Sequence, residues 1–232
     1  MRRSRPMPDV SAASAGERPL STLARRTPTA LLYAAVVLLA ALAPVDWWPF
    51  FPALLVFFFV VGIRELARLA HGRPQHVLGG AAYLAVGLSG LGALWAGAPR
   101  WLVAAILATW AADTVAYLAG SLIGRHKIAP RISPGKTWEG TIAGFIAAAA
   151  VVGLLLGADT AATIVAVGLG PVAFAGDLFE SWLKRRAGAK DSGSLLPGHG
   201  GILDRIDSLL FVGPFVVIVL LVAGGPDGMM GR

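Results

Sequence analysis

The sequence predicts an all-α, polytopic bundle of transmembrane helices, with about seven membrane spans and roughly six to nine as the range. Three observations lead to this prediction. Hydrophobic residues make up 56% of the 232-residue chain and charged residues only 14%, against about 25% in ordinary soluble domains. Several apolar stretches are long enough to cross a bilayer. Basic residues lie at the ends of these stretches, as membrane topology requires.

The elements follow in order along the chain. Residues 1–29 are polar and rich in Pro, Ser and Arg, so we expect a disordered, basic cytoplasmic tail. A signal peptide with an apolar core at 30–43 is the alternative, but no convincing cleavage site precedes the next span. The first span is short, so it either begins earlier or forms a re-entrant hairpin with the second. The expected spans are 30–43, 47–63, 77–96, 101–123, 140–157, 160–183 and 207–224.

The distribution of basic residues predicts the orientation. If the N-terminus is cytoplasmic and the spans alternate, all of the 20 Lys and Arg residues except Arg100 and Arg232 fall on the cytoplasmic side. The net charge of +7 therefore follows from topology, and we expect no nucleic-acid partner. The chain has no cysteine, which excludes disulfides and thiolate chemistry.

We expect four regions in the chain: the tail, N-terminal membrane helices at 30–100, a catalytic membrane domain at 101–224, and a short tail at 225–232. The catalytic domain contains two polar loops, 124–139 and 184–206. Both loops would face the cytoplasm, where nucleotides and magnesium are available.

Carboxylates gather where apolar runs meet these loops, and charge in a membrane is costly unless it is paired or functional. They are Asp113, Asp177, Glu180, Asp204 and Asp207. Glu180 and Lys184 are spaced for an ion pair on one helix face. Asp177 has no basic residue on the preceding turn, so it needs a cation. Structural alternatives are a hydrogen bond for Asp113 and helix-dipole stabilisation for Asp204 and Asp207.

The two loops carry groups suited to phosphate binding. Loop 124–139 offers Arg131, Ser133, Lys136 and Thr137 before the next span. It is not a P-loop, because Pro130 stands where that motif needs glycine and no strand is expected before it. The glycine cluster at 198–201 offers backbone N–H groups that an anion can approach closely. The alternatives are an ordinary basic loop that binds anionic lipid and a flexible turn.

A long pattern in the second half of the chain resembles a known family. It reads Ser181-x-Leu183-Lys184-Arg185-x4-Lys190-Asp191-x-Gly193-x2-Leu196-Pro197-x-His199-Gly200-Gly201-Ile202-x-Asp204-Arg205-Ile206-Asp207. Three upstream stretches also fit: Asp113-Thr114-x-Ala116-Tyr117, Ser133-Pro134-x-Lys136-Thr137-x-Glu139-Gly140 and Gly176-Asp177-Leu178-x-Glu180-Ser181. The pattern is similar to the full signature of phosphatidate cytidylyltransferases, the membrane enzymes also called CDP-diacylglycerol synthases. The resemblance covers residues 105–224.

The resemblance implies a reaction in phospholipid biosynthesis that converts CTP and phosphatidic acid to CDP-diacylglycerol and pyrophosphate. It also implies Mg²⁺ with a second cation (K⁺ or another Mg²⁺) and a homodimer in the cell membrane. Asp177 and Asp204 would bind the metals by position, with Asp207 and Asp113 as further candidates. The candidate catalytic residues are Asp177, Asp204, Lys184 and Arg205. The candidate substrate-binding residues are Arg131, Ser133, Lys136, Thr137, Arg185, Lys190, Asp191, His199, Gly200 and Gly201.

The residues themselves suit this chemistry. A lipid phosphate is already an anionic nucleophile, so no strong general base is needed. The main difficulty is to bring two polyanions together, and metal ions on carboxylates with Lys and Arg around them can neutralise that charge. An ion-coupled transporter is an alternative, but it would place acids near the bilayer midplane. A CDP-alcohol phosphotransferase would need an Asp-rich helix pair that the sequence lacks, and a polyprenol kinase relative is the third alternative.

Overall fold

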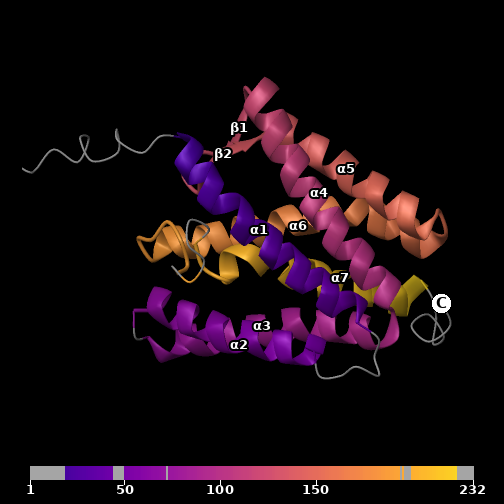
Figure 1. Ribbon diagram of the computed structural model, residues 1–232, viewed down its shortest axis with the longest axis horizontal. Helices are drawn as coiled ribbons and strands as arrows, with labels where there is room; N and C mark the ends of the chain where they lie inside the picture. Colours follow the sequence, from indigo (N-terminus) through magenta and orange to yellow (C-terminus); the bar gives the residue numbers. More distant parts are fainter. Residues whose placement is uncertain (1–18, 44–49, 72, 194, 196–199, 224–232) are drawn as a thin grey trace, which may run out of the picture.

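The computed structural model describes residues 19–43, 50–71, 73–193, 195 and 200–223, with side chains from residue 31 onward. This part of the chain forms seven α-helices and one β-hairpin (Figure 1). The helices are α1 (Pro19–Leu42), α2 (Phe50–Leu69), α3 (Pro74–Gly97), α4 (Pro99–Ile123), α5 (Trp138–Leu156), α6 (Thr160–Arg186) and α7 (Leu203–Ala223). Helices α2 to α7 are long and apolar enough to cross a membrane, which confirms the predicted all-α membrane bundle.

The first helix differs from its predicted form. It begins at Pro19, so residues 19–29, expected to belong to a disordered tail, are helical. Proline suits the first helical position, where its missing N–H costs no hydrogen bond. The apolar part of this helix, Leu31–Leu42, is shorter than the six spans of the other helices. The remainder of the tail, residues 1–18, and the short tail at 225–232 lie outside the described residues.

Most helices extend further than the apolar runs predict. α2 continues to Leu69, and α6 continues through its three basic residues to Arg186. α7 begins at Leu203 rather than at 207. A span predicted from hydropathy stops at the first charged residues. The helix itself continues, because its backbone hydrogen bonds are kept and long basic side chains can reach the polar interface.

Loop 124–139 contains two strands that the sequence did not indicate. β1 (Lys127–Ala129) pairs antiparallel with β2 (Ser133–Thr137), with Lys127 opposite Thr137. A strand therefore does precede Pro130, contrary to expectation. The Gly135-Lys136-Thr137 run itself is strand, so this is still not the loop of a P-loop motif. β2 leads directly into α5, and Thr137 caps that helix by accepting a hydrogen bond from Gly140 N at 3.3 Å.

Helix α7 lies at the centre of the bundle, between the α2–α3 pair and the α4–α5 pair (Figure 1). Half of its span is buried within the protein, the largest share among the six spans. α6 approaches it closely at Gly176, where an added Cβ would lie 2.7 Å from the backbone oxygen of Asp207. A glycine at this crossing lets Asp177 lie beside the first turns of α7.

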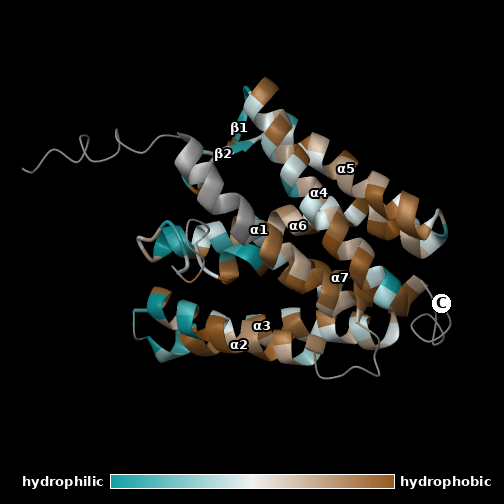
Figure 2. Cartoon of the chain, viewed as in Figure 1, coloured by the Kyte–Doolittle hydropathy of each residue, from teal (hydrophilic) through white to brown (hydrophobic). Residues whose placement is uncertain are grey.

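The hydrophilic connections gather at one end of the bundle (Figure 2). Arg185 Nε donates to Ile132 O of the hairpin at 3.1 Å, which ties the end of α6 to that hairpin. His71 Nε2, in the turn between α2 and α3, lies 3.0 Å from Ala187 O. Both predicted polar loops therefore lie at the same end, as alternating spans require.

Candidate functional site

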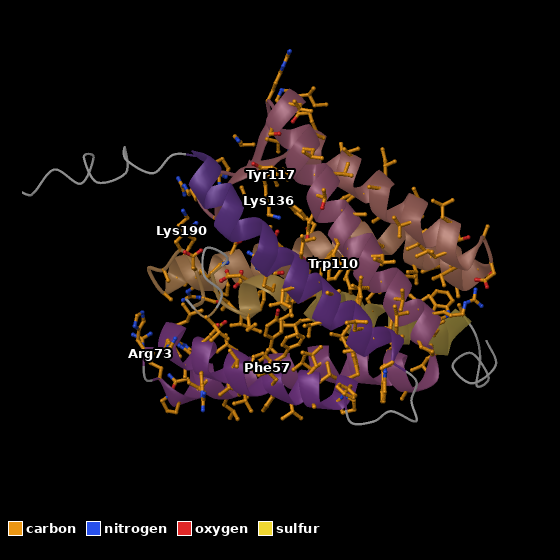
Figure 3. All side chains as sticks on the ribbon, viewed as in Figure 1. Phe57, Arg73, Trp110, Tyr117, Lys136 and Lys190 are labelled. Atoms are coloured by element: carbon orange, nitrogen blue, oxygen red, sulfur yellow. The ribbon has the colours of Figure 1, made fainter. Side chains whose placement is uncertain are left out.

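A cavity of about 640 Å³ lies between α4, the hairpin, α5 and α6. Its polar groups include Asp113, Ser133, Lys136 and Asp177, and its apolar wall includes Phe174. The cavity lies at the hydrophilic end, where Figure 3 shows Lys136 on the hairpin, and Lys190 and Arg73 near the same end of the molecule. It can therefore receive a molecule that has both charged and apolar parts.

Asp177 is the carboxylate of α6 that faces this cavity. Its Oδ2 pairs with Lys136 Nζ, and its Oδ1 accepts from Ser181 Oγ at 3.3 Å. Lys136 Nζ also lies 4.8 Å from the centre of the Phe174 ring. The sequence predicted that Asp177 needs a cation, and in this structure an ammonium group from the hairpin fills that position. Asp113 lines the same cavity, and the carboxyl groups of Asp113 and Asp207 both lie within electrostatic range of Asp177.

A second cluster surrounds Asp204 in the first turn of α7. Lys184 Nζ pairs with Asp204 Oδ1 at 2.5 Å and with the buried Glu180 carboxylate, which confirms the predicted Glu180–Lys184 pair. Asp204 Oδ2 accepts from Ser192 N at 3.0 Å, Ser192 Oγ at 2.9 Å and Gly201 N at 2.7 Å. Lys184 thus joins Asp204 to Glu180, which lies three residues beyond Asp177 on α6.

Most of the remaining predicted residues are either exposed or already in contact with other parts of the protein. Exposed at the hydrophilic end are Arg131, Arg185, Lys190 and Asp191. Engaged by the protein are Thr137 as a helix cap, Gly201 N on Asp204, and Arg205, whose backbone oxygen accepts from Tyr33 Oη at 3.0 Å. Gly200 has a φ of +77°, a left-handed conformation that favours glycine. His199 lies outside the described residues.

The glycine cluster was expected to present free N–H groups to a phosphate. In the structure the Gly201 amide instead donates to Asp204, because the chain turns there to begin α7. The backbone at this turn therefore binds a side chain of the protein itself.

Sequence reasoning missed Glu65, which is buried at 3% exposure near the end of α2. It accepts hydrogen bonds from Ser192 Oγ, Ile202 N and Leu203 N, each at 2.9 Å. The available signal was an acid between Arg64 and Arg68, just beyond the apolar run. An acid there looks like an ordinary interfacial charge unless its burial is known.

The donor set can be compared with what a metal ion needs. Within the described part of the chain, no group of three or more His, Asp or Glu side chains is arranged to hold a metal by itself. A carboxylate has about four acceptor positions. Asp177 uses one on each oxygen, and Asp204 keeps capacity on Oδ1, where Lys184 is its partner. Mg²⁺ is commonly held by one or two carboxylates with waters and substrate phosphates, so each of these two carboxylates has the acceptor capacity that such an ion uses.

Comparison with known proteins places the chain in a family. Proteins named phosphatidate cytidylyltransferase are similar to it. The one from Brucella abortus is 47% identical over 125 residues, which are 51% of this chain and 46% of the relative. The one from Staphylococcus haemolyticus is 42% identical over 146 residues, 60% of this chain and 56% of the relative. The one from Pseudomonas aeruginosa is 41% identical over 142 residues, which are 56% of this chain and 51% of the relative. The aligned part of the chain thus spans about half the length of these curated relatives.

A family model with a broader reach matches residues 18–223, from α1 to the end of α7. It covers both the cavity and the Asp204 cluster. Because this match takes in nearly all of the chain, the protein belongs to the Cytidylyltransferase family.

Proposed function

We propose that this protein transfers the cytidylyl group of CTP to phosphatidic acid, giving CDP-diacylglycerol and pyrophosphate. The observation that carries the proposal is the cavity between α4, the hairpin, α5 and α6, where Lys136, Asp113 and Asp177 meet among membrane helices. Relatives named phosphatidate cytidylyltransferase support this substrate pair. A charged headgroup and an acyl-bearing lipid need a site with this mixed lining.

The reaction is a nucleotidyl transfer. An oxygen of the lipid phosphate attacks the α-phosphorus of CTP, a new P–O bond forms, and the bond to the β-phosphate oxygen breaks to release pyrophosphate. The nucleophile is already anionic near neutral pH, so the protein needs no strong general base. Its task is to bring two polyanions together and to stabilise the charge that develops on the leaving group.

Asp177 and Asp204 would hold Mg²⁺, with Asp113 and Asp207 supplying further negative charge near Asp177. Bound there, the ion would neutralise phosphate charge and orient the triphosphate. A second cation, K⁺ or another Mg²⁺, is part of the same proposal. Lys136 and Lys184 now pair with these carboxylates. Both ammonium groups are on flexible side chains. They would donate hydrogen bonds to substrate phosphates when a metal ion binds the carboxylates in their place.

We propose that the hydrophilic end faces the cytoplasm from a bacterial cell membrane. The basic residues Arg73, Arg131, Arg185 and Lys190 at this end support that orientation through the positive-inside rule. CTP would enter from that side and phosphatidic acid from the lipid. A homodimer is proposed on the family resemblance alone.

The test uses purified protein in detergent with phosphatidic acid and each of the four nucleoside triphosphates. We expect pyrophosphate release with CTP only, and only when Mg²⁺ is present. Labelled CTP separates the competing functions: cytidine label in the lipid supports the proposal, and terminal phosphate in the lipid indicates a kinase. No transfer of either label under conditions where a relative is active would refute it.

A further inference from the structure

Glu65 connects the N-terminal helices to the Asp204 cluster, although more than 120 residues separate them in the sequence. Three donors converge on its carboxylate: Ser192 Oγ and Leu203 N on Oε2, and Ile202 N on Oε1, each at 2.9 Å. Two of these donors are the amide of Ile202, directly before α7, and the amide of Leu203, the first residue of α7. Glu65 therefore caps this helix from a different part of the chain.

The backbone on both sides of the carboxylate is fitted to it. An added Cβ at Gly193 would lie 2.6 Å from Glu65 Oε1, and one at Gly201 would lie 2.4 Å from Oε2. At both distances a side chain larger than hydrogen would displace the Glu65 carboxylate. The two glycines thus let the chain close around Glu65 from residues 192–193 and from residues 200–203.

The same segments position Asp204. Ser192 N, Ser192 Oγ and Gly201 N all donate to Asp204 Oδ2. The Ser192 hydroxyl lies 2.9 Å from both Glu65 Oε2 and Asp204 Oδ2, and it has a single proton to share between them. Among the described residues, every donor to Asp204 Oδ2 therefore belongs to a residue that contacts Glu65 or lies beside one that does.

We infer that Glu65 is a positioning residue for Asp204, and this inference rests on the proposed function. Glu65 fixes Ser192 and the first turn of α7. Those groups hold Oδ2 of Asp204, so that Oδ1 faces Lys184 and remains available to a cation. Glu65 itself touches neither substrate nor metal in this scheme. The N-terminal helices thereby contribute to a reaction whose sequence signature lies in the second half of the chain.

A carboxylate is required because it only accepts hydrogen bonds. Glutamine has nearly the same shape, but it replaces one oxygen with an NH₂ group. That NH₂ group would face the amide of Ile202 or of Leu203, so one donor loses its acceptor. Aspartate keeps the carboxylate, but its side chain is one methylene shorter, so the carboxylate lies further from the three donors.

The experiment compares Glu65→Gln with Glu65→Asp and with a matched control, Asp159→Asn. Asp159 also caps a helix, since its Oδ1 accepts from Ala162 N at 2.8 Å, but it lies at the start of α6. That position is about 27 Å along the helix from Asp177. Each variant is measured for kcat and KM per folded molecule, and for hydrogen–deuterium exchange of peptides covering residues 200–206.

We expect Glu65→Gln to lower kcat about 10- to 100-fold, the usual effect of removing a partner that orients a metal ligand. KM for CTP should change less than about threefold, because ground-state binding is not removed. Exchange at residues 200–206 should rise about tenfold, the effect of one lost buried hydrogen bond. Glu65→Asp should restore part of kcat, and Asp159→Asn should leave kcat and this exchange unchanged.

Two outcomes overturn the inference. One is unchanged exchange at residues 200–206 in Glu65→Gln. The other is faster exchange with wild-type kcat, which would make Glu65 a structural cap only. If Glu65→Gln does not fold, Glu65→Asp carries the same two tests. If the wild-type protein makes no CDP-diacylglycerol, the proposed function fails, while the exchange measurement still decides whether Glu65 holds the start of α7.

Discussion

Asp177 and Asp204 are held in different ways. The Asp177 side chain is 28% exposed and is contacted by two side chains, Lys136 and Ser181. The Asp204 side chain is 9% exposed and accepts two backbone amides in addition to Ser192 Oγ and Lys184. Asp177 faces the cavity, whereas Asp204 is built into the start of α7.

The difference separates two kinds of dependence. A carboxylate held by flexible side chains can change partners when a ligand enters, with little effect on the fold. A carboxylate that accepts backbone amides contributes to the structure as well as to the site. Substitutions at both positions should therefore lower activity, but only those at Asp204 should also lower stability substantially.

The largest effect is expected for Asp177→Asn. Loss of a cation's carboxylate ligand removes several kcal/mol of transition-state stabilisation, so CDP-diacylglycerol formation should fall at least about 1,000-fold. The Tm in detergent should change little, because the partners of Asp177 within the described residues are side chains and not backbone amides. Activity near that of the wild type at saturating Mg²⁺ would remove Asp177 from the metal site.

Asp204→Asn should reduce both activity and stability. Activity should fall at least about 100-fold, and removing one partner of a buried ion pair should cost about 3–5 kcal/mol of stability. Thermal unfolding of Asp177→Asn and Asp204→Asn, measured side by side, checks the comparison directly. Equal Tm values would show that the backbone contacts of Asp204 contribute nothing that Asp177 lacks.

Lys136→Gln should have an intermediate effect. If Lys136 Nζ donates a hydrogen bond to a phosphate when substrate is bound, its loss should lower kcat about 10- to 100-fold. The Mg²⁺ concentration for half-maximal activity should fall, because the ammonium group no longer competes for Asp177. Arg125→Gln, an exposed residue before the hairpin, removes the same charge and is the control. A higher Mg²⁺ requirement in Lys136→Gln would contradict the idea that a metal ion replaces Lys136 as the partner of Asp177.

The sequence alone accounts for the membrane bundle and for most of the charged groups in the site. Apolar runs reveal spans because length and hydropathy are local properties, and acids such as Asp177 are conspicuous within them. Pairings are different, because they join distant positions: Lys136 with Asp177 across 41 residues, and Glu65 with Ser192 across 127. Nothing near Glu65 in the chain indicates that the first turn of α7 closes over it.

The hairpin could not be anticipated for a related reason. Its strands are short and contain Pro134 and Gly135, which disfavour strands, so their pairing depends on neighbouring structure. Arg185 supplies part of that context through Ile132 O, from 53 residues away. A resemblance to a family can identify Lys136 as part of the site, but only the fold shows which carboxylate it meets.

The smallest effect on activity is expected for Thr137→Ala. This variant tests whether the pairing of Lys136 with Asp177 needs the helix cap that the neighbouring Thr137 provides. Thr137 is 2% exposed and caps α5 directly after Lys136, so its loss should cost about 1 kcal/mol of stability. Because a small local cost at the end of β2 leaves the Lys136–Asp177 pair intact, kcat should change less than about threefold. Thr137→Ser keeps the cap and is the matched control. If Thr137→Ala lost as much activity as Lys136→Gln without further loss of stability, the hydroxyl would be acting on substrate, and the hairpin would contribute two ligands to the cavity rather than one.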